Sequence, residues 1–144
     1  MTPTPPMTVL TSAAAYFAIV FGAGFVLGVL RTLWLAPAVG PLWAVVIELP
    51  LILGIAWLAC ARVLRRWPLA PTQAAAMGAL AFVLLMAAEA ALSLGLGGRS
   101  LVEHLALYAR AEHQLGLAGQ VVFAALPWLR ARAGHAAARK FTAP

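Results

Sequence analysis

Residues 43–66 read WAVVIELPLILGIAWLACARVLRR, an apolar run closed by arginines that contains one carboxylate, Glu48, and one proline, Pro50. A helix needs about twenty consecutive apolar residues to cross the hydrocarbon core of a bilayer. The run therefore predicts a transmembrane helix over residues 43–64, bent at Pro50, which removes one backbone hydrogen bond. Because an ionised side chain is costly at this depth, we expect Glu48 to have a partner inside the protein.

The composition of the whole chain also indicates a membrane protein. Of its 144 residues, 64% are hydrophobic and 10% are charged, whereas soluble domains carry about 25% charged residues. The chain has too few polar residues to cover a surface that faces water, so its main partner is the lipid bilayer. The net charge of +6 comes from basic residues at the ends of apolar runs. No basic face with interleaved aromatic residues is present, so we expect no binding to nucleic acid.

The remaining apolar runs predict the rest of the fold. Three further spans are expected over residues 9–35, 72–96 and 115–130. Between the last two, residues 100–113 predict a short amphipathic helix at the membrane interface, which begins with the capping-box pattern of Ser100 and Glu103. The predicted fold is all-α: a transmembrane four-helix bundle over residues 9–132, with a flexible segment at 1–8 and a polar tail at 133–144.

Small residues in the first span predict close helix packing. Gly24 and Gly28 form a GxxxG-like face, which allows close contact either within the bundle or with a second copy of the chain. Pro37, Gly40 and Pro41 predict that the helix breaks after the first span. The single cysteine, Cys60, lies within an apolar run and is expected to be a small buried residue.

The distribution of basic residues predicts the orientation in the membrane. The side that holds both termini carries seven basic residues: Arg62, Arg65, Arg66, Arg130, Arg132, Arg139 and Lys140. The opposite side carries three, which are Arg31, Arg99 and Arg110. The positive-inside rule therefore predicts a multi-pass protein with cytoplasmic N- and C-termini and an extracytoplasmic helix at 100–113.

The charged residues within the spans are predicted to lie at similar depths. At about 1.5 Å per residue, Glu48 and Glu89 both lie roughly 6–7 Å outward from the centres of their spans. Arg31 stands near the outer end of the first span, and Gln120 lies within the fourth. We expect these four residues to form a polar cluster in the outer leaflet. Four further residues are expected to lie above it as an outer lid: Glu103, His104, Glu112 and His113.

This cluster has three interpretations. It can be a structural network in which Arg31 pairs with Glu48, Glu89 or both and fixes the packing of the helices. It can instead form an outward-facing pocket whose two carboxylates bind a proton, a cation or a cationic substrate group. Two glutamates with His104 or His113 would also suit a metal ion. However, the Glu-x-x-His spacing of di-iron bundles is absent, and we predict no metal ligand, catalytic residue or cofactor.

Several segments together resemble a group of small four-span inner-membrane proteins of proteobacteria. The resemblance is carried by FGAGFVLGVLRTLWLAP (21–37), IELPLILGIAWLACARVLRR (47–66), AAEAALSLGL (87–96), GRSLVEH (98–104) and PWLRAR (127–132). It covers residues 13–132 and implies a four-span architecture in a bacterial inner membrane. No activity is established for that group, so the resemblance implies no reaction.

The sequence leads to three expectations about function. The first is an accessory or interaction subunit of a larger membrane system, in which the polar cluster organises the bundle and a membrane protein is the partner. The alternative is a small proton- or cation-coupled transporter or channel that uses Glu48 and Glu89, and such a small protein would need to form a homodimer. The second alternative is a metal-dependent membrane enzyme.

Overall fold

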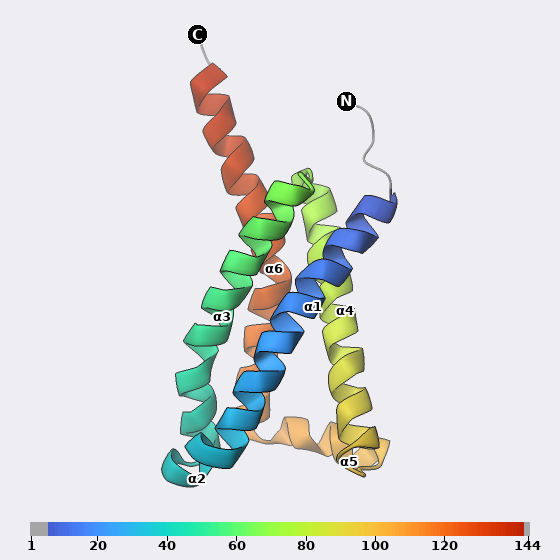
Figure 1. Ribbon diagram of the computed structural model, residues 1–144, viewed down its shortest axis with the longest axis vertical. Coiled ribbons are helices and arrows are strands. Elements are labelled where there is room, and N and C mark those ends of the chain that lie inside the picture. The colour runs from blue at the N-terminus through green and yellow to red at the C-terminus, as the bar shows by residue number, and fades with distance from the viewer. Residues whose placement is uncertain (1–5, 143–144) are drawn as a thin grey trace.

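The computed structural model describes the backbone of residues 6–142 and the side chains of residues 6–138. Within this part of the chain every regular element is helical, which confirms the predicted all-α class. Four long helices lie side by side (Figure 1): α1 (Pro6–Leu30), α3 (Pro41–Arg66), α4 (Pro71–Gly95) and α6 (Ala111–Thr142). The shorter elements are a π-helical turn (Arg31–Leu35), α2 (Ala36–Val39), α5 (Leu101–Ala106) and a 3₁₀ turn (Leu107–Ala109).

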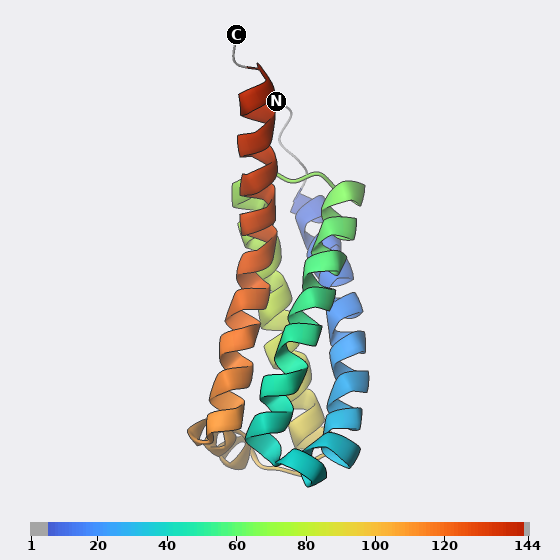
Figure 2. The same cartoon turned by 90° about the vertical axis from the view of Figure 1, so that its left-hand side faces the viewer.

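The four long helices form a closed ring of contacts. α1 packs against α3 and α4, and α6 packs against the same two helices on the other side. Both described chain ends lie at one end of the molecule, which we call the terminal end (Figures 1 and 2). α2 and α5 lie at the opposite end, which we call the α5 end, and α5 runs across the direction of the long helices there.

Three helical segments are long and apolar enough to cross a membrane. They are residues Pro6–Val39, Pro41–Arg66 and Pro71–Gly95, and they contain most of the first three predicted spans. α6 contains the predicted fourth span, residues 115–130, but it is less apolar than the other three helices. These segments are compatible with a membrane protein.

Of the three residues predicted to break the helix, Gly40 marks the break and Pro41 begins the next helix, whereas Pro37 does not interrupt the helix. The helix continues to Val39 through a π-helical turn, in which the Ala36 N–H bonds to the carbonyl oxygen of Arg31. A proline in a regular α-helix clashes with the carbonyl group four residues earlier, and the wider π turn just before Pro37 accommodates it. The chain reverses instead at Gly40, whose φ of 87° is a conformation that L side chains rarely adopt.

The helices also extend beyond several predicted boundaries. α1 begins at Pro6, and α6 continues to Thr142 through most of the expected polar tail at 133–144. The alanines of that segment are strong helix formers, which explains the extension. Residues 1–5 and 143–144, and the side chains of Arg139 and Lys140, lie outside the described residues. The expected helix over residues 100–113 is shorter, because the chain leaves helical geometry at Arg110 before α6 begins.

The predicted capping box at the start of α5 is formed. The Ser100 hydroxyl accepts a hydrogen bond from the Glu103 N–H at 3.2 Å, and the Glu103 carboxylate accepts one from the Ser100 N–H at 2.7 Å. These two bonds satisfy backbone donors that a helix N-terminus otherwise leaves free. They fix the point at which the connection after α4 turns into α5.

The buried core lies in the half of the molecule toward the terminal end. Small residues let the helices approach closely there, and a Cβ atom added at Gly78 on α4 would collide with the carbonyl oxygen of Ala124 on α6. Cys60 is fully buried in this core, as predicted. Tyr16 is also fully buried, and its ring stacks on that of Phe123. Toward the α5 end the buried core stops and a cavity takes its place.

Candidate functional site: a polar cavity between four helices

A cavity of about 670 Å³ lies between α1, α3, α4 and α6 in the half toward the α5 end. Pockets that bind small molecules commonly measure roughly 300–1,000 Å³. Much of the wall of this cavity is apolar. Its apolar lining includes Phe21, Phe25, Ile52, Leu85, Leu117 and Phe123. Six of the residues predicted for the polar cluster or its lid also line it: Arg31, Glu48, Glu89, Glu112, His113 and Gln120.

Arg31 and Glu48 form an ion pair on one side of the cavity. Arg31 Nε lies 2.5 Å from Glu48 Oε2, and the two side chains are 33% and 15% exposed. Arg31 is the first residue of the π-helical turn, so the pair joins that turn to α3. The ion pair therefore neutralises Glu48 and connects two neighbouring helical segments at the same time.

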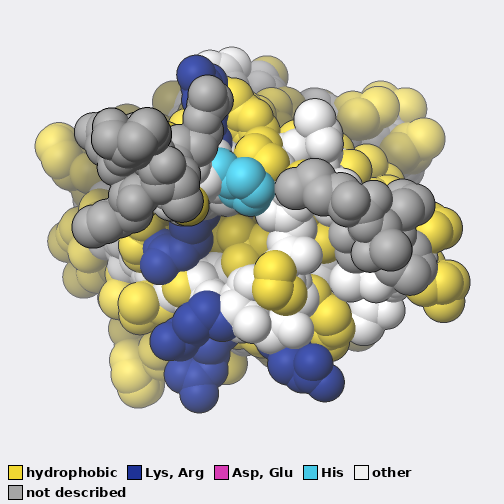
Figure 3. Space-filling model, turned by 90° about the horizontal axis from the view of Figure 1, so that it is seen from above, with side chains coloured by type: hydrophobic (Ala, Val, Ile, Leu, Met, Phe, Trp, Pro, Cys, Tyr) yellow, Lys and Arg dark blue, Asp and Glu magenta, His cyan; other side chains and the backbone are white. Residues whose placement is uncertain are grey.

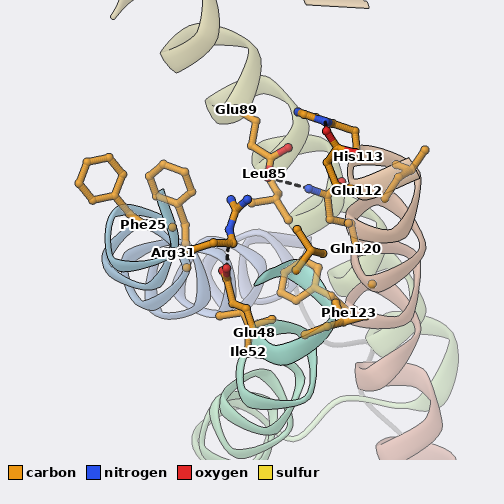
Figure 4. A pocket seen from close by; sticks show the side chains of 18 of the residues that line it. Phe25, Arg31, Glu48, Ile52, Leu85, Glu89, Glu112, His113, Gln120 and Phe123 are labelled. Atoms are coloured by element: carbon orange, nitrogen blue, oxygen red, sulfur yellow. Dashed lines mark hydrogen bonds and ion pairs between the residues drawn. The ribbon is translucent and has the colours of Figure 1, made fainter. Parts of the chain in front are cut away.

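Glu89 and Gln120 meet on the other side of the cavity. Gln120 Nε2 donates a hydrogen bond of 2.6 Å to Glu89 Oε1, which joins α4 to α6. Within the described side chains Glu89 forms no ion pair. The guanidinium group of Arg31 points from Glu48 toward Glu89 (Figure 4), and among the described side chains its ion pair is with Glu48. The two carboxylates are thus in different states, since one is paired with a cation and the other accepts from a neutral amide.

Two polar atoms beside Glu89 are buried without a partner among the described residues. They are Gln120 Oε1 and the hydroxyl oxygen of Ser93, which stands one helical turn after Glu89 on α4. Buried polar atoms are nearly always hydrogen-bonded, so two unpaired atoms at the wall of one cavity indicate a place where a polar ligand group is accepted.

The predicted outer lid is divided by the structure. His104 is buried, and its ring meets the ring of Tyr108 edge-on with centroids 5.8 Å apart. Tyr108 in turn meets His113 edge-on at 6.3 Å. Glu112 and His113 line the cavity at its α5 end, with Glu112 Oε1 4.0 Å from His113 Nδ1.

Glu103 does not belong to this lid, contrary to the prediction. It is exposed, and its carboxylate caps α5 through Ser100 instead of facing the cavity. The hydrogen bonds that it accepts from the Ser100 N–H and hydroxyl hold the pKa of Glu103 below its usual range. The capping geometry explains the difference, because a carboxylate bonded to the start of its own helix cannot also reach the cavity.

The face that α5 presents to the protein is polar. His104 is turned inward, whereas Leu101 and Leu105 are each 59% exposed. A helix that lies on the core of a soluble protein has the reverse arrangement. The leucines of α5 are therefore directed away from the rest of the chain.

The residues predicted for helix packing and bending have different surroundings. Gly24 and Gly28 line the cavity, and a Cβ added at Gly24 would lie 3.7 Å from Ile52, an ordinary contact. The close helix approach occurs instead at Gly78. Pro50 is exposed, and α3 continues as a helix through it.

Four polar cavity residues were not predicted from the sequence: Thr32, Ser93, Arg99 and Tyr108. Ser93 follows Glu89 by four residues, and this spacing places both on one face of a helix, so it was a usable signal. Tyr108 follows Leu101 and Leu105 at helical spacing, which is typical of an apolar stripe. Arg99 follows an apolar run, a position typical of an anchor at the membrane surface. At neither of these two positions does the sequence pattern indicate that the side chain points into the protein.

Within the described residues, no group of three or more His, Cys, Asp or Glu side chains is arranged to hold a metal ion. No protein-family model, curated protein or solved structure matches this chain. Its function is therefore inferred from the cavity itself.

Proposed function

We propose that this chain is a four-span protein of a bacterial inner membrane that binds a small organic cation at Glu89 and exchanges it for a proton. The observation that carries this proposal is the difference between the two acids of the cavity. Glu48 is paired with Arg31, whereas Glu89 faces the cavity without a cation partner among the described side chains. A carboxylate in such a place binds either a proton or a cationic group, and the two compete for it.

The surface of the protein supports a position in the membrane. Large apolar side chains are exposed along α1, α3 and α4, the helices that are long enough to span. Trp34 and Trp43 are 73% and 62% exposed at the α5 end, and Trp67 and Trp128 lie near the terminal end. Tryptophan is enriched at both surfaces of a bilayer. These positions suit a membrane whose surfaces lie near the two ends of the molecule.

The proposed fourth span is supported by the helices that pack against α6, and the proposed orientation is supported by the distribution of basic residues. α6 packs along both α3 and α4, so its apolar part over residues 115–130 lies at the depth of two membrane-capable helices. Figure 3 looks down on the terminal end, where Arg side chains gather and no acidic side chain is visible among the described residues of that face. The positive-inside rule then assigns the terminal end to the cytoplasm and the cavity to the outer half.

The walls of the cavity indicate the class of ligand. A protonated amine or quaternary ammonium group would lie at Glu89, with Gln120 beside it. Phe21, Phe25 and Phe123 would contact an apolar or aromatic body, and aromatic faces also attract cations. Since one chain has few spans, we propose that two copies form the transporting unit.

A different function is favoured by the Arg31–Glu48 ion pair alone. It supports the accessory-subunit interpretation, in which the polar cluster only holds the π-helical turn against α3. A purely structural cluster needs no cavity, however, and well-packed side chains would stabilise the helices more. We therefore place the structural role at Arg31 and Glu48 and the binding role at Glu89 and Gln120.

Exchange in proteoliposomes tests the proposal. Vesicles that contain purified protein, a trapped pH-sensitive dye and benzyltrimethylammonium are diluted into buffer without the cation, at equal pH on both sides. Outward movement of the cation in exchange for protons should acidify the lumen. Glu89→Gln should abolish the acidification, whereas Glu48→Gln should lower thermal stability and retain exchange.

A pair of glycine variants separates the cavity from general effects on folding. Gly116 lines the cavity and Gly54 does not, and an added Cβ at either position meets nothing within 4 Å. Gly116→Leu should narrow the cavity and slow exchange, and Gly54→Leu is the matched control. Exchange that persists in Glu89→Gln would contradict the proposal. The accessory-subunit interpretation would be favoured by two results together. Vesicles with the wild-type protein would acidify no faster than vesicles without protein, and a stoichiometric partner would co-purify with the protein from membranes.

A further inference from the structure

A second pocket lies at the terminal end, far from the cavity between the four helices. Its volume is about 490 Å³, and it is formed by the last turns of α3, the connection to α4 and one face of α6. Its polar side chains are Arg65, Arg130 and His135, and its apolar wall includes Leu58, Leu64 and Leu69. This combination of basic and apolar groups suits an anionic amphiphile.

Arg130 has an incomplete set of partners. Its guanidinium carbon lies 4.2 Å from the centre of the Trp57 ring, so one face of the group is covered by an aromatic side chain. Its Nη1 atom is buried and has no hydrogen-bond partner among the described residues. A buried guanidinium donor without an acceptor is costly, so this nitrogen indicates that an acceptor is supplied from outside the chain.

The sequence contains no acidic side chain that could serve as a counterion at this end. Its four carboxylate side chains are Glu48, Glu89, Glu103 and Glu112. Two of them line the cavity from α3 and α4, one caps α5, and one lies in the first turn of α6, so all four belong to the α5 half. The positive charges of Arg65 and Arg130 must therefore be balanced by an anion that is not a side chain of this protein.

We propose that this pocket binds the phosphate group of an anionic phospholipid, with Arg65 and Arg130 as its cationic ligands. Basic pockets between helices at the cytoplasmic surface are typical sites for such headgroups. Leu58 is 67% exposed beside the pocket, and it provides an apolar surface along which an acyl chain lies. The proposal rests on the pocket, its charges and the proposed orientation in the membrane, and it stands whether or not the cavity transports a cation.

Gly134 allows the pocket to be tested without a change in charge. It lines the pocket, and a Cβ added there would meet nothing within 4 Å. Gly134→Leu therefore occupies part of the pocket while every arginine stays in place. Arg62 supplies the complementary control, because it is an exposed basic residue near the same end of α3 but does not line the pocket.

Native mass spectrometry and thermal unfolding of the purified full-length protein in detergent test the proposal with three probes. Phosphatidylglycerol should bind saturably and raise the unfolding temperature. Phosphatidylcholine and inorganic phosphate at equal concentration should bind more weakly. Arg130→Gln, Arg65→Gln and Gly134→Leu should each weaken phosphatidylglycerol binding about tenfold or more, as expected for the loss of a charge-assisted contact or of the space itself. Arg62→Gln should retain binding.

Each other result overturns the proposal in a defined way. Equal losses in Arg62→Gln and Arg65→Gln would mean diffuse attraction to the basic end. Unchanged binding in Gly134→Leu would mean that the lipid lies elsewhere. Inorganic phosphate that binds as tightly as the lipid would assign the site to a free anion. Arg65 is exposed and Gly134 has open space, so these two variants decide the outcome even if Arg130→Gln does not fold.

Discussion

The hydroxyl group of Tyr16 on α1 donates a hydrogen bond of 2.9 Å to the backbone carbonyl oxygen of Phe123 on α6. The two rings also stack, with centroids 4.5 Å apart and planes 12° from parallel. Pro127 explains why this carbonyl is available, because proline has no N–H to bond to the residue four positions earlier. The buried hydroxyl thus satisfies an acceptor that the α6 helix leaves free. This bond lies on the terminal side of the cavity, whose wall includes Phe123.

This relationship predicts coupling between Tyr16 and Pro127. Tyr16→Phe should lower the free energy of unfolding by about 1 kcal/mol, since the Phe123 carbonyl loses its donor inside the protein. Pro127→Ala restores an N–H to that carbonyl, so the effect of Tyr16→Phe should shrink in the Pro127→Ala background. A double-mutant cycle, measured by unfolding in mixed micelles, checks this. Strictly additive losses would mean that the carbonyl does not link the two positions.

The close approach of α4 and α6 predicts a strong effect at Gly78. A Cβ there collides with a backbone oxygen, which cannot rotate away, so Gly78→Ala should force the helices apart and destabilise the protein by about 1–3 kcal/mol. Gly54→Ala is the matched control because its Cβ meets nothing within 4 Å. The same unfolding measurement should find the control unchanged or slightly stabilised. Equal stability of the two variants would contradict the close contact.

The ion pair predicts non-additive losses at Arg31 and Glu48. Removal of one partner leaves the other charge unpaired, and for this partly exposed pair we expect a loss of about 2 kcal/mol, between the values typical of exposed and of buried pairs. The double variant Arg31→Gln with Glu48→Gln should lose less than the sum of the two single variants. Equilibrium unfolding of all four proteins at one salt concentration measures the difference. If the losses simply add, Arg31 has another main partner.

The capping box predicts a pH dependence of α5. Because the pKa of Glu103 is held below its usual range, the ionised carboxylate is the form that the folded helix favours. Its contribution to α5 is fully present above the unfolded pKa of about 4.3 and is lost as the pH falls through the lowered folded pKa. Hydrogen exchange of the α5 amides across this range should show protection falling at acidic pH. Ser100→Ala should lower the protection roughly fivefold at neutral pH and weaken the pH dependence.

Local features of the sequence determined where the helices lie. The lengths of the apolar runs located three membrane-capable helices, and the serine–glutamate pattern identified the start of α5. Helix rise along the axis placed Glu48, Glu89 and Arg31 at similar depths, and all three line one cavity. Pro37 was misleading because the effect of a proline depends on whether the preceding turn can widen.

Only the tertiary structure decided which of these side chains pair and what space lies between them. Apolar residues surround α1 and α4 on nearly all sides, so periodicity does not identify their inner faces. The rotation of each helix about its axis depends instead on contacts between residues far apart in sequence, such as Gly78 with Ala124 and Tyr16 with Phe123. Those contacts close the terminal half of the molecule. They leave Glu89 on the wall of a cavity while Glu48 is paired with Arg31.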